Sequence, residues 1–86
     1  MPTLAIFYGI VITVYWFDHP PPHIHARYGE FEAQIDIARV QIIAGSLPRR
    51  AQAMVLEWTQ EHQAELMTAF AAASSGNRPA RIAPLR

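Results

Sequence analysis

The most regular alternation of apolar and polar residues lies in residues 30–37. Its apolar members are Phe31, Ala33, Ile35 and Ile37, and its polar members are Glu30, Glu32, Gln34 and Asp36. A period of two is typical of a strand with one buried face. With the preceding segment, residues 23–28, this strand predicts a hairpin. If Tyr28-Gly29 is its two-residue turn, Arg27 pairs with Glu30 and His25 with Glu32.

The segment before the hairpin is apolar on both of its faces. Residues 10–17 therefore predict a strand that is central or covered on both sides. A short strand is expected at residues 4–8 and another at residues 40–44, ending at Gly45. Residues 18–22 contain three prolines in a row and predict an extended loop, because proline cannot donate to a strand ladder.

Residues 46–75 have the pattern of one long helix. Pro48 suits the first helical turn, and Gly76 suits a C-terminal stop. At 100° per residue one apolar stripe forms, comprising Ala51, Met54, Val55, Trp58, His62, Leu66, Ala69 and Ala73. Leu56, Met67 and Phe70 fall outside that stripe and predict a second apolar surface for a partner protein or a homodimer. Since His62 lies within the stripe, we expect it to hydrogen-bond a carbonyl or a carboxylate.

Together these elements predict an α+β fold. It is a three- to five-stranded, mainly antiparallel β-meander with one long C-terminal helix packed on one face. A chain of 86 residues allows a single domain, 1–86. Within it, residues 1–45 are the β-rich part, 46–75 the helix and 76–86 a tail. Ile82 and Leu85 are spaced to pin this tail to the domain.

Composition narrows the function classes. The net charge is zero, and cysteine and lysine are both absent, which excludes disulfides, thiol nucleophiles and Schiff-base chemistry. The longest apolar run is too short to span a bilayer, so no membrane contact and a cytoplasmic location are expected. Arginines are more frequent in the second half of the chain. Arg49, Arg50, Arg78 and Arg81 are a weak indication of RNA or an acidic partner.

The densest chemical signal is Asp18-His19-Pro20-Pro21-Pro22-His23-Ile24-His25, which holds three of the four histidines. On a strand, His23 and His25 point to the same face with Cα atoms about 6.6–7 Å apart. Two imidazoles at that spacing can hold one divalent transition-metal ion, with His19 or Asp18 added from the loop. The alternative is that both histidines are half-exposed strand residues without a ligand.

The polar face of the hairpin offers a second chemistry. A nuclease-like hydrolase needs histidines for proton transfer, a carboxylate as base and an arginine to stabilise the charge of the phosphate. The candidate catalytic residues for this chemistry are His23, His25, Arg27 and Glu32. The competing interpretation is a solvated face whose ion pairs each contribute little. The sequence leaves open whether the chain is an enzyme.

Many short motifs along the chain occur together in a known family. They are Phe7-Tyr8-Gly9-Ile10, Asp18-His19, Pro21 to Ala26, Tyr28-Gly29-Glu30, Gly45 to Ala51, Glu57-Trp58, His62, Glu65-Leu66 and the closing Ile82, Pro84 and Leu85. In these motifs the chain resembles a small bacterial domain-of-unknown-function family, number four-one-six-zero, nearly from end to end.

The resemblance implies no established activity. It implies that the gene lies beside one for another small domain of unknown function, in an arrangement similar to toxin–antitoxin pairs. The resulting prediction is an interaction component of a toxin–antitoxin-like module that binds a small partner protein encoded nearby. The alternative is a metal-binding protein or nuclease-like hydrolase centred on His23 and His25.

Overall fold

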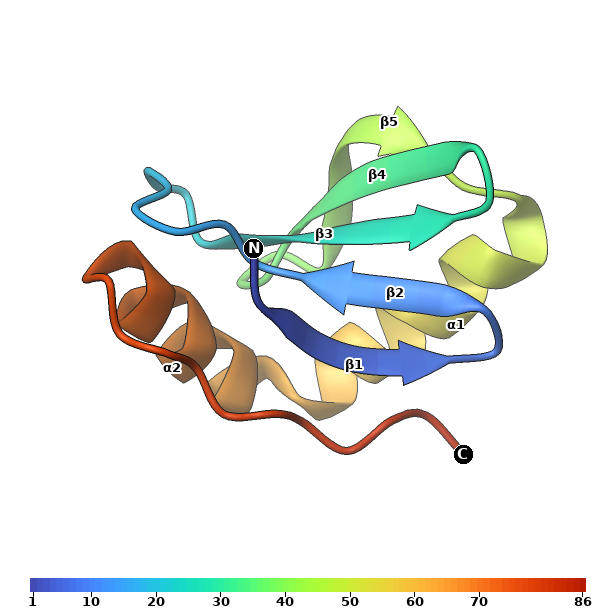
Figure 1. The fold of residues 1–86 in the computed structure, drawn as a ribbon. Coiled ribbons are helices and arrows are strands. Elements are labelled where there is room, and N and C mark those ends of the chain that lie inside the picture. The colour runs from blue at the N-terminus through green and yellow to red at the C-terminus, as the bar shows by residue number, and fades with distance from the viewer.

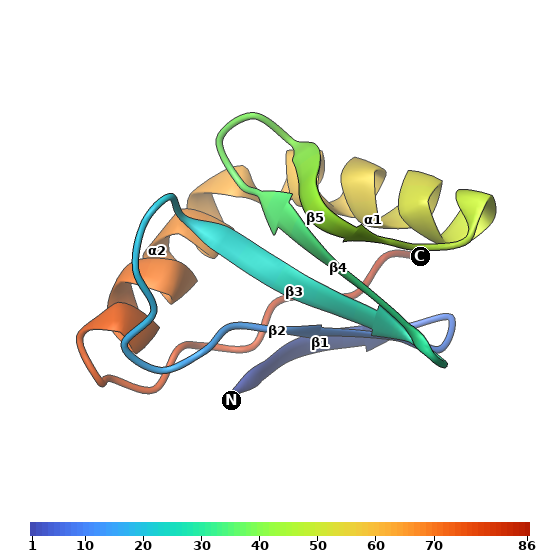
Figure 2. The ribbon, with the colours of Figure 1, turned by 90° about the horizontal axis from the view of Figure 1, so that it is seen from above.

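Five strands form one antiparallel sheet in the order in which they follow along the chain (Figure 1). The computed structural model describes residues 1–86. The strands are β1 (Thr3–Phe7), β2 (Ile10–Thr13), β3 (His23–Tyr28), β4 (Phe31–Asp36) and β5 (Gln41–Ser46). Two helices, α1 (Arg49–Glu61) and α2 (Gln63–Ser74), lie together on one face of the sheet (Figure 2). The α+β class and the antiparallel meander are confirmed.

The hairpin turn between β3 and β4 lies one residue later than predicted. Tyr28 faces Phe31 across the ladder, so Gly29 and Glu30 form the turn, and Gly29 adopts a φ of +57° that glycine reaches without steric cost. Each residue of β3 therefore faces a partner two positions further along than expected. A shift of two keeps every side chain on its face, but His25 now faces Gln34, and Glu32 lies diagonal to it.

The prediction of one long helix is wrong, because the helix divides at His62. This residue has φ −121° and ψ 26°, outside the helical range, and α2 starts immediately after it. No glycine or proline marks the break. The contact that accompanies it is tertiary: the Gln63 side-chain amide donates to the carbonyl oxygens of Ile37 and Ala38, at 2.9 and 3.2 Å, in the turn after β4. Two short helices can follow a twisted sheet more closely than one straight helix.

The structure does not contain the second apolar helix surface that the sequence predicted at Leu56, Met67 and Phe70. Phe70 is only 7% exposed and belongs to the core, and Leu56 is partly buried against it. Met67 alone remains exposed, at 41%. Because the break at His62 changes the phase of α2, Leu66, Ala69, Phe70 and Ala73 form its buried stripe.

The C-terminal tail lies along the edge of the sheet formed by β1 (Figure 1). The backbone N–H of Ile82 donates to the carbonyl of Leu4 at 2.9 Å, and the indole N–H of Trp58 donates to the carbonyl of Ala83 at 2.8 Å. Ile82 is buried and Leu85 packs against the core, so both residues hold the tail as predicted. Neither helix has the length and apolar character that a membrane crossing requires.

Candidate metal centre

The loop between β2 and β3 is fixed to the C-terminal end of α2. The backbone N–H of Phe17 donates to the carbonyl of Ala73 at 3.0 Å, and the hydroxyl of Ser74 donates to the carbonyl of Asp18 at 3.1 Å. These two hydrogen bonds involve the backbone of Phe17 and of Asp18, on either side of the point where the Asp18 side chain leaves the chain. They therefore hold its carboxylate over the start of β3, where His23 and His25 lie.

The two oxygens of Asp18 have different partners. Oδ1 accepts the backbone N–H of His19 at 2.9 Å. Oδ2 lies 3.0 Å from Nε2 of His23 and 3.6 Å from Nε2 of His25. One oxygen thus fixes the orientation of the carboxylate, and the other is directed at both imidazoles.

The hydrogen bond on the far side of the His23 ring determines which nitrogen carries its proton. Nδ1 lies 2.7 Å from the carbonyl oxygen of Pro21, and a carbonyl can only accept, so Nδ1 is the donor. In the neutral ring Nε2 then carries a lone pair, and this lone pair faces Asp18 Oδ2. Two electron-rich atoms 3.0 Å apart require a proton or a metal cation between them.

His25 is the least satisfied polar residue of the chain. Its side chain is 7% exposed, and neither ring nitrogen has a hydrogen-bond partner. Tyr15 lies parallel to the imidazole, with ring centroids 3.8 Å apart and an interplanar angle of 4°. Nε2 is directed toward Asp18, and Nδ1 is 3.8 Å from Oε2 of Glu32. Buried polar groups normally have partners, so this arrangement indicates a ligand for Nε2.

The electrostatics favour the protonation states that bind metal. Burial opposes ionisation of Asp18, but the His19 backbone N–H and the neighbouring histidines outweigh it and lower the pKa of the carboxyl. Desolvation, followed by the adjacent His23, lowers the pKa of His25 against the opposing effect of Asp18 and Glu32. Near neutral pH the site therefore combines a carboxylate with a neutral His25 imidazole, and metal ions bind these forms.

The distances from Asp18 Oδ2 to the two imidazoles are close to those of a mononuclear metal site. One donor atom each from Asp18, His23 and His25 lies within 4.8 Å of the other two. Donors about 2.1 Å from one ion lie about 3.0–3.4 Å apart in octahedral or tetrahedral geometry, close to the separations from Asp18 Oδ2. The Pro21 carbonyl lies next to Nδ1 of His23, and Glu32 lies next to Nδ1 of His25. In metal sites the second nitrogen of a ligating histidine commonly has such a carbonyl or carboxylate beside it.

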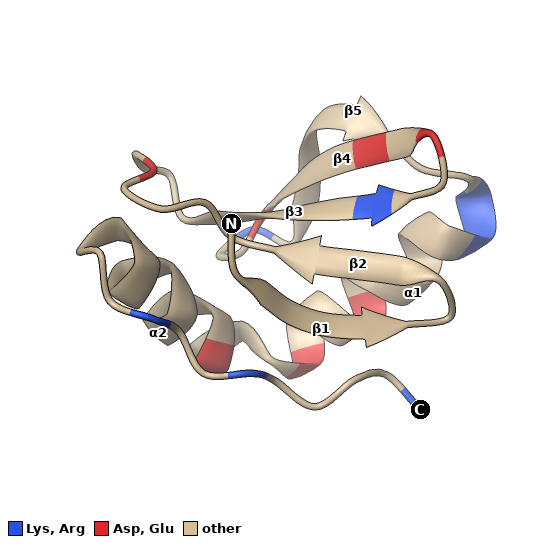
Figure 3. Cartoon of the chain, in the orientation of Figure 1, with Lys and Arg blue, Asp and Glu red and all other residues tan.

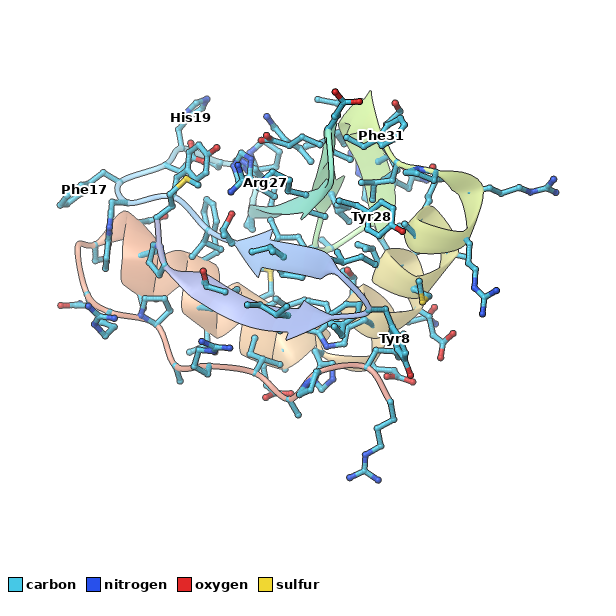
Figure 4. All side chains as sticks on the ribbon, turned by 45° about the vertical axis from the view of Figure 1, so that its right-hand side comes forward. Tyr8, Phe17, His19, Arg27, Tyr28 and Phe31 are labelled. Atoms are coloured by element: carbon cyan, nitrogen blue, oxygen red, sulfur yellow. The ribbon has the colours of Figure 1, made fainter.

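The other residues singled out from the sequence lie around this set or outside it. The ring of His19 is 89% exposed and reaches only Asp18 Oδ1, at 3.2 Å, so His19 is outside the three-residue cluster (Figure 4). Arg27 is exposed on β3 and forms no ion pair with a carboxylate. His62 hydrogen-bonds Glu65 at 2.6 Å, which confirms that it has a structural partner.

Three residues of the site were not expected from the sequence. Tyr15 covers His25, Phe70 packs with its ring centroid 5.6 Å from that of His23, and Ser74 holds the loop. Tyr15 lies within an apolar run, and Phe70 and Ser74 are distant in sequence from the histidines. No local motif could have indicated any of them.

Comparison with known proteins gives one match. The family model described as "Domain of unknown function (DUF4160)" matches residues 9–71. This range contains Asp18, His23, His25 and Phe70, so the whole candidate centre except Ser74 lies within the matched region. No curated protein and no solved structure matches the chain.

Proposed function

The chain belongs to the family described as "Domain of unknown function (DUF4160)", whose description assigns no activity, and we propose from the geometry alone that it binds one divalent transition-metal ion through Asp18, His23 and His25. The observation that carries the proposal is His25, a buried imidazole with both nitrogens unpaired beside a carboxylate. Leaving such a residue buried without a ligand is costly.

The donor set indicates the class of metal. Two imidazoles and one carboxylate suit zinc or iron(II) rather than calcium or magnesium, which prefer oxygen ligands. Three protein ligands would leave coordination positions free, and an ion held in this way would supply Lewis acidity to a molecule bound there. The ion would also join the β2–β3 loop, β3 and, through Ser74, the end of α2. Metal binding would therefore stabilise the fold.

Metal analysis of untagged protein is the direct test of this proposal. Wild-type chain is expected to bind about one equivalent of Zn²⁺ or Co²⁺, as one donor set per chain implies. Asp18→Asn keeps the size of the side chain but replaces the charged donor by a weak one, and we expect affinity to fall by at least about 100-fold. Isothermal titration calorimetry measures both values, and the absorption spectrum of the Co²⁺ form reports the ligand geometry.

His19→Gln is the matched control, because His19 is adjacent to Asp18 in sequence but its ring is exposed and outside the cluster. It should leave affinity within about threefold of wild type. Occupancy below about 0.2 equivalents would overturn the proposal. Equal losses for His19→Gln and Asp18→Asn would overturn the three-residue ligand set.

The role of interaction component in a toxin–antitoxin-like pair stays a prediction from the family resemblance. The helix surface that supported it is mostly buried, since Phe70 and Leu56 belong to or pack on the core. The nuclease-like alternative loses support as well, because His23 and His25 are buried and the pocket beside His25 holds only about 40 Å³. Co-expression with the product of the neighbouring gene, without co-purification, would contradict the interaction role.

A further inference from the structure

A second candidate site lies at the end of β3 that is remote from His23. There a pocket of about 540 Å³ opens between the β1–β2 turn, the end of β3, the first turns of α1 and the C-terminal tail. Its volume is within the range of about 300–1,000 Å³ typical of small-molecule sites. None of the proposed metal ligands lines it, so it is independent of the metal centre.

Two tyrosines form the aromatic wall of the pocket. Tyr8 and Tyr28 are 60% and 38% exposed and lie at the same end of the sheet (Figure 4). The ring of Tyr28 rests against Gly9, so closely that a Cβ added to this glycine would lie 3.3 Å from Cε1 of the tyrosine. An exposed aromatic ring held in place in this way offers a flat surface on which another planar ring can stack.

The backbone at Tyr8 shows that the fold does not require a tyrosine there. Tyr8 has a φ of +50° and occupies the first position of the two-residue turn between Phe7 and Ile10. Asparagine and glycine adopt this left-handed conformation at lower cost than a bulky residue. The ring of Tyr8 also contributes nothing to the buried core. Its presence is therefore better explained by a ligand than by folding.

The charges at this pocket suit an anionic ligand that also carries hydrogen-bond donors. Arg50 and Arg86 line it, and neither guanidinium is in salt-bridge contact with a carboxylate, since every basic side chain that approaches a carboxylate this closely is a histidine. Figure 3 shows arginine positions at the start of α1 and at the end of the tail. Guanidinium groups bind phosphate oxygens in a bidentate manner. Glu57, on the same lining, can accept hydrogen bonds from an amino group or a ring N–H of a base.

We propose that this pocket binds a nucleoside phosphate, with the base against Tyr8 and Tyr28 and the phosphate on Arg50 and Arg86. The base would lie over an apolar floor that includes Met54. A free mononucleotide and the end of a single-stranded RNA present the same chemistry. The site goes beyond the proposed metal binding and does not depend on it.

Titration of ¹⁵N-labelled full-length protein, followed by NMR, tests the proposal. The probes are AMP, CMP, GMP and UMP, each added separately, and a 5′-phosphorylated hexauridylate. Saturable shifts are expected for the amides of Gly9, Tyr28 and Ala51, and none for that of His25. If the hexauridylate binds more tightly than UMP by about tenfold or more, the ligand of the pocket is the end of an RNA strand. Equal affinities indicate that the ligand is a free nucleotide. No saturation by any probe up to about 5 mM would overturn the proposal.

Two variants and one control distinguish binding at this pocket from non-specific electrostatic attraction. Tyr8→Asn should lower affinity about tenfold by removing the stacking surface, and should keep or raise the melting temperature because asparagine suits the turn. Arg50→Gln, on an exposed helix position, should lower affinity about fivefold. Arg39→Gln removes the same charge from the exposed turn between β4 and β5, and should change affinity by less than about twofold. Equal losses for Arg50→Gln and Arg39→Gln, or unchanged binding by Tyr8→Asn, would overturn the site.

Discussion

Replacing His25 by phenylalanine is expected to abolish metal binding and to make the metal-free chain more stable than wild type. Phenylalanine can keep the parallel stacking with Tyr15, whose ring centroid is 3.8 Å from that of the imidazole. It removes two buried nitrogens that have no hydrogen-bond partner. Each buried unsatisfied polar group costs about 1–3 kcal/mol, so we expect metal-free His25→Phe to gain about 1–2 kcal/mol in free energy of unfolding.

Metal should reverse the order of the two proteins. A ligand present at about 100 times its Kd stabilises the folded state by about 2.7 kcal/mol. Wild type should gain this amount from Zn²⁺, and His25→Phe should gain nothing. Urea unfolding in EDTA and in excess Zn²⁺, followed by circular dichroism, measures all four free energies. A histidine that served only folding would not produce this crossing of stabilities.

His62→Phe is the control for this experiment. It makes the same chemical change at a half-buried histidine whose Nδ1 already hydrogen-bonds Glu65. Its metal-free stability should fall, and its gain from Zn²⁺ should equal that of wild type. The interpretation of His25 as a metal ligand fails if His25→Phe is still stabilised by Zn²⁺. It also fails if His25→Phe is less stable than wild type in EDTA by more than about 1 kcal/mol.

The strands could be predicted because their signals are local. Alternation in residues 30–37 places Ala33 and Ile35 in the core, and both are buried. The register could not be predicted to the residue, because Gly29 fits either position of a two-residue turn. The choice between Tyr28-Gly29 and Gly29-Glu30 changes which residue lies opposite His25 but leaves its face unchanged. The pattern of a strand therefore predicts its faces better than its partners.

The helix break and the walls of the metal centre depend on contacts between distant parts of the chain. Gln63 bonds to the turn after β4, and Ser74 bonds to the carbonyl of Asp18 across 56 positions of sequence. Neither contact has a local signature. The ligand candidates themselves, Asp18, His23 and His25, lie within eight residues and could be singled out. Sequence thus indicated the donor atoms, and only the fold shows that both imidazoles are buried, that Tyr15 stacks on His25 and that Phe70 packs against His23.

Trp58 is the residue whose truncation should have the largest effect on stability. It is completely buried on α1, its ring centroid lies 5.3 Å from that of Phe7, and its indole N–H bonds the tail at Ala83. Truncating a buried tryptophan to alanine costs about 3–5 kcal/mol. A core of this size supplies about 3–5 kcal/mol in total. We therefore expect Trp58→Ala to be largely unfolded at 25 °C, with loss of amide dispersion in the NMR spectrum.

Trp58→Phe separates packing from the bond to the tail. Phenylalanine keeps the contact with Phe7 but cannot donate to the carbonyl of Ala83, an exposed residue where water can replace the lost donor. The loss of that bond should cost about 0.5–1.5 kcal/mol, in addition to the loss of ring area. Because Ile82 lies in the same tail, hydrogen exchange of its amide, bonded to Leu4, should accelerate more than exchange in β3 and β4.

Trp16→Ala is the matched control, since Trp16 is 38% exposed in the β2–β3 loop and is not part of the core. Surface substitutions usually change stability by less than about 0.5 kcal/mol, so Trp16→Ala should remain folded. The role assigned to Trp58 would be contradicted if both alanine variants lost the same free energy of unfolding. It would also be contradicted if Trp58→Phe left exchange at Ile82 unchanged, because the tail would then be held by apolar packing of Ile82 and Leu85 without the indole hydrogen bond.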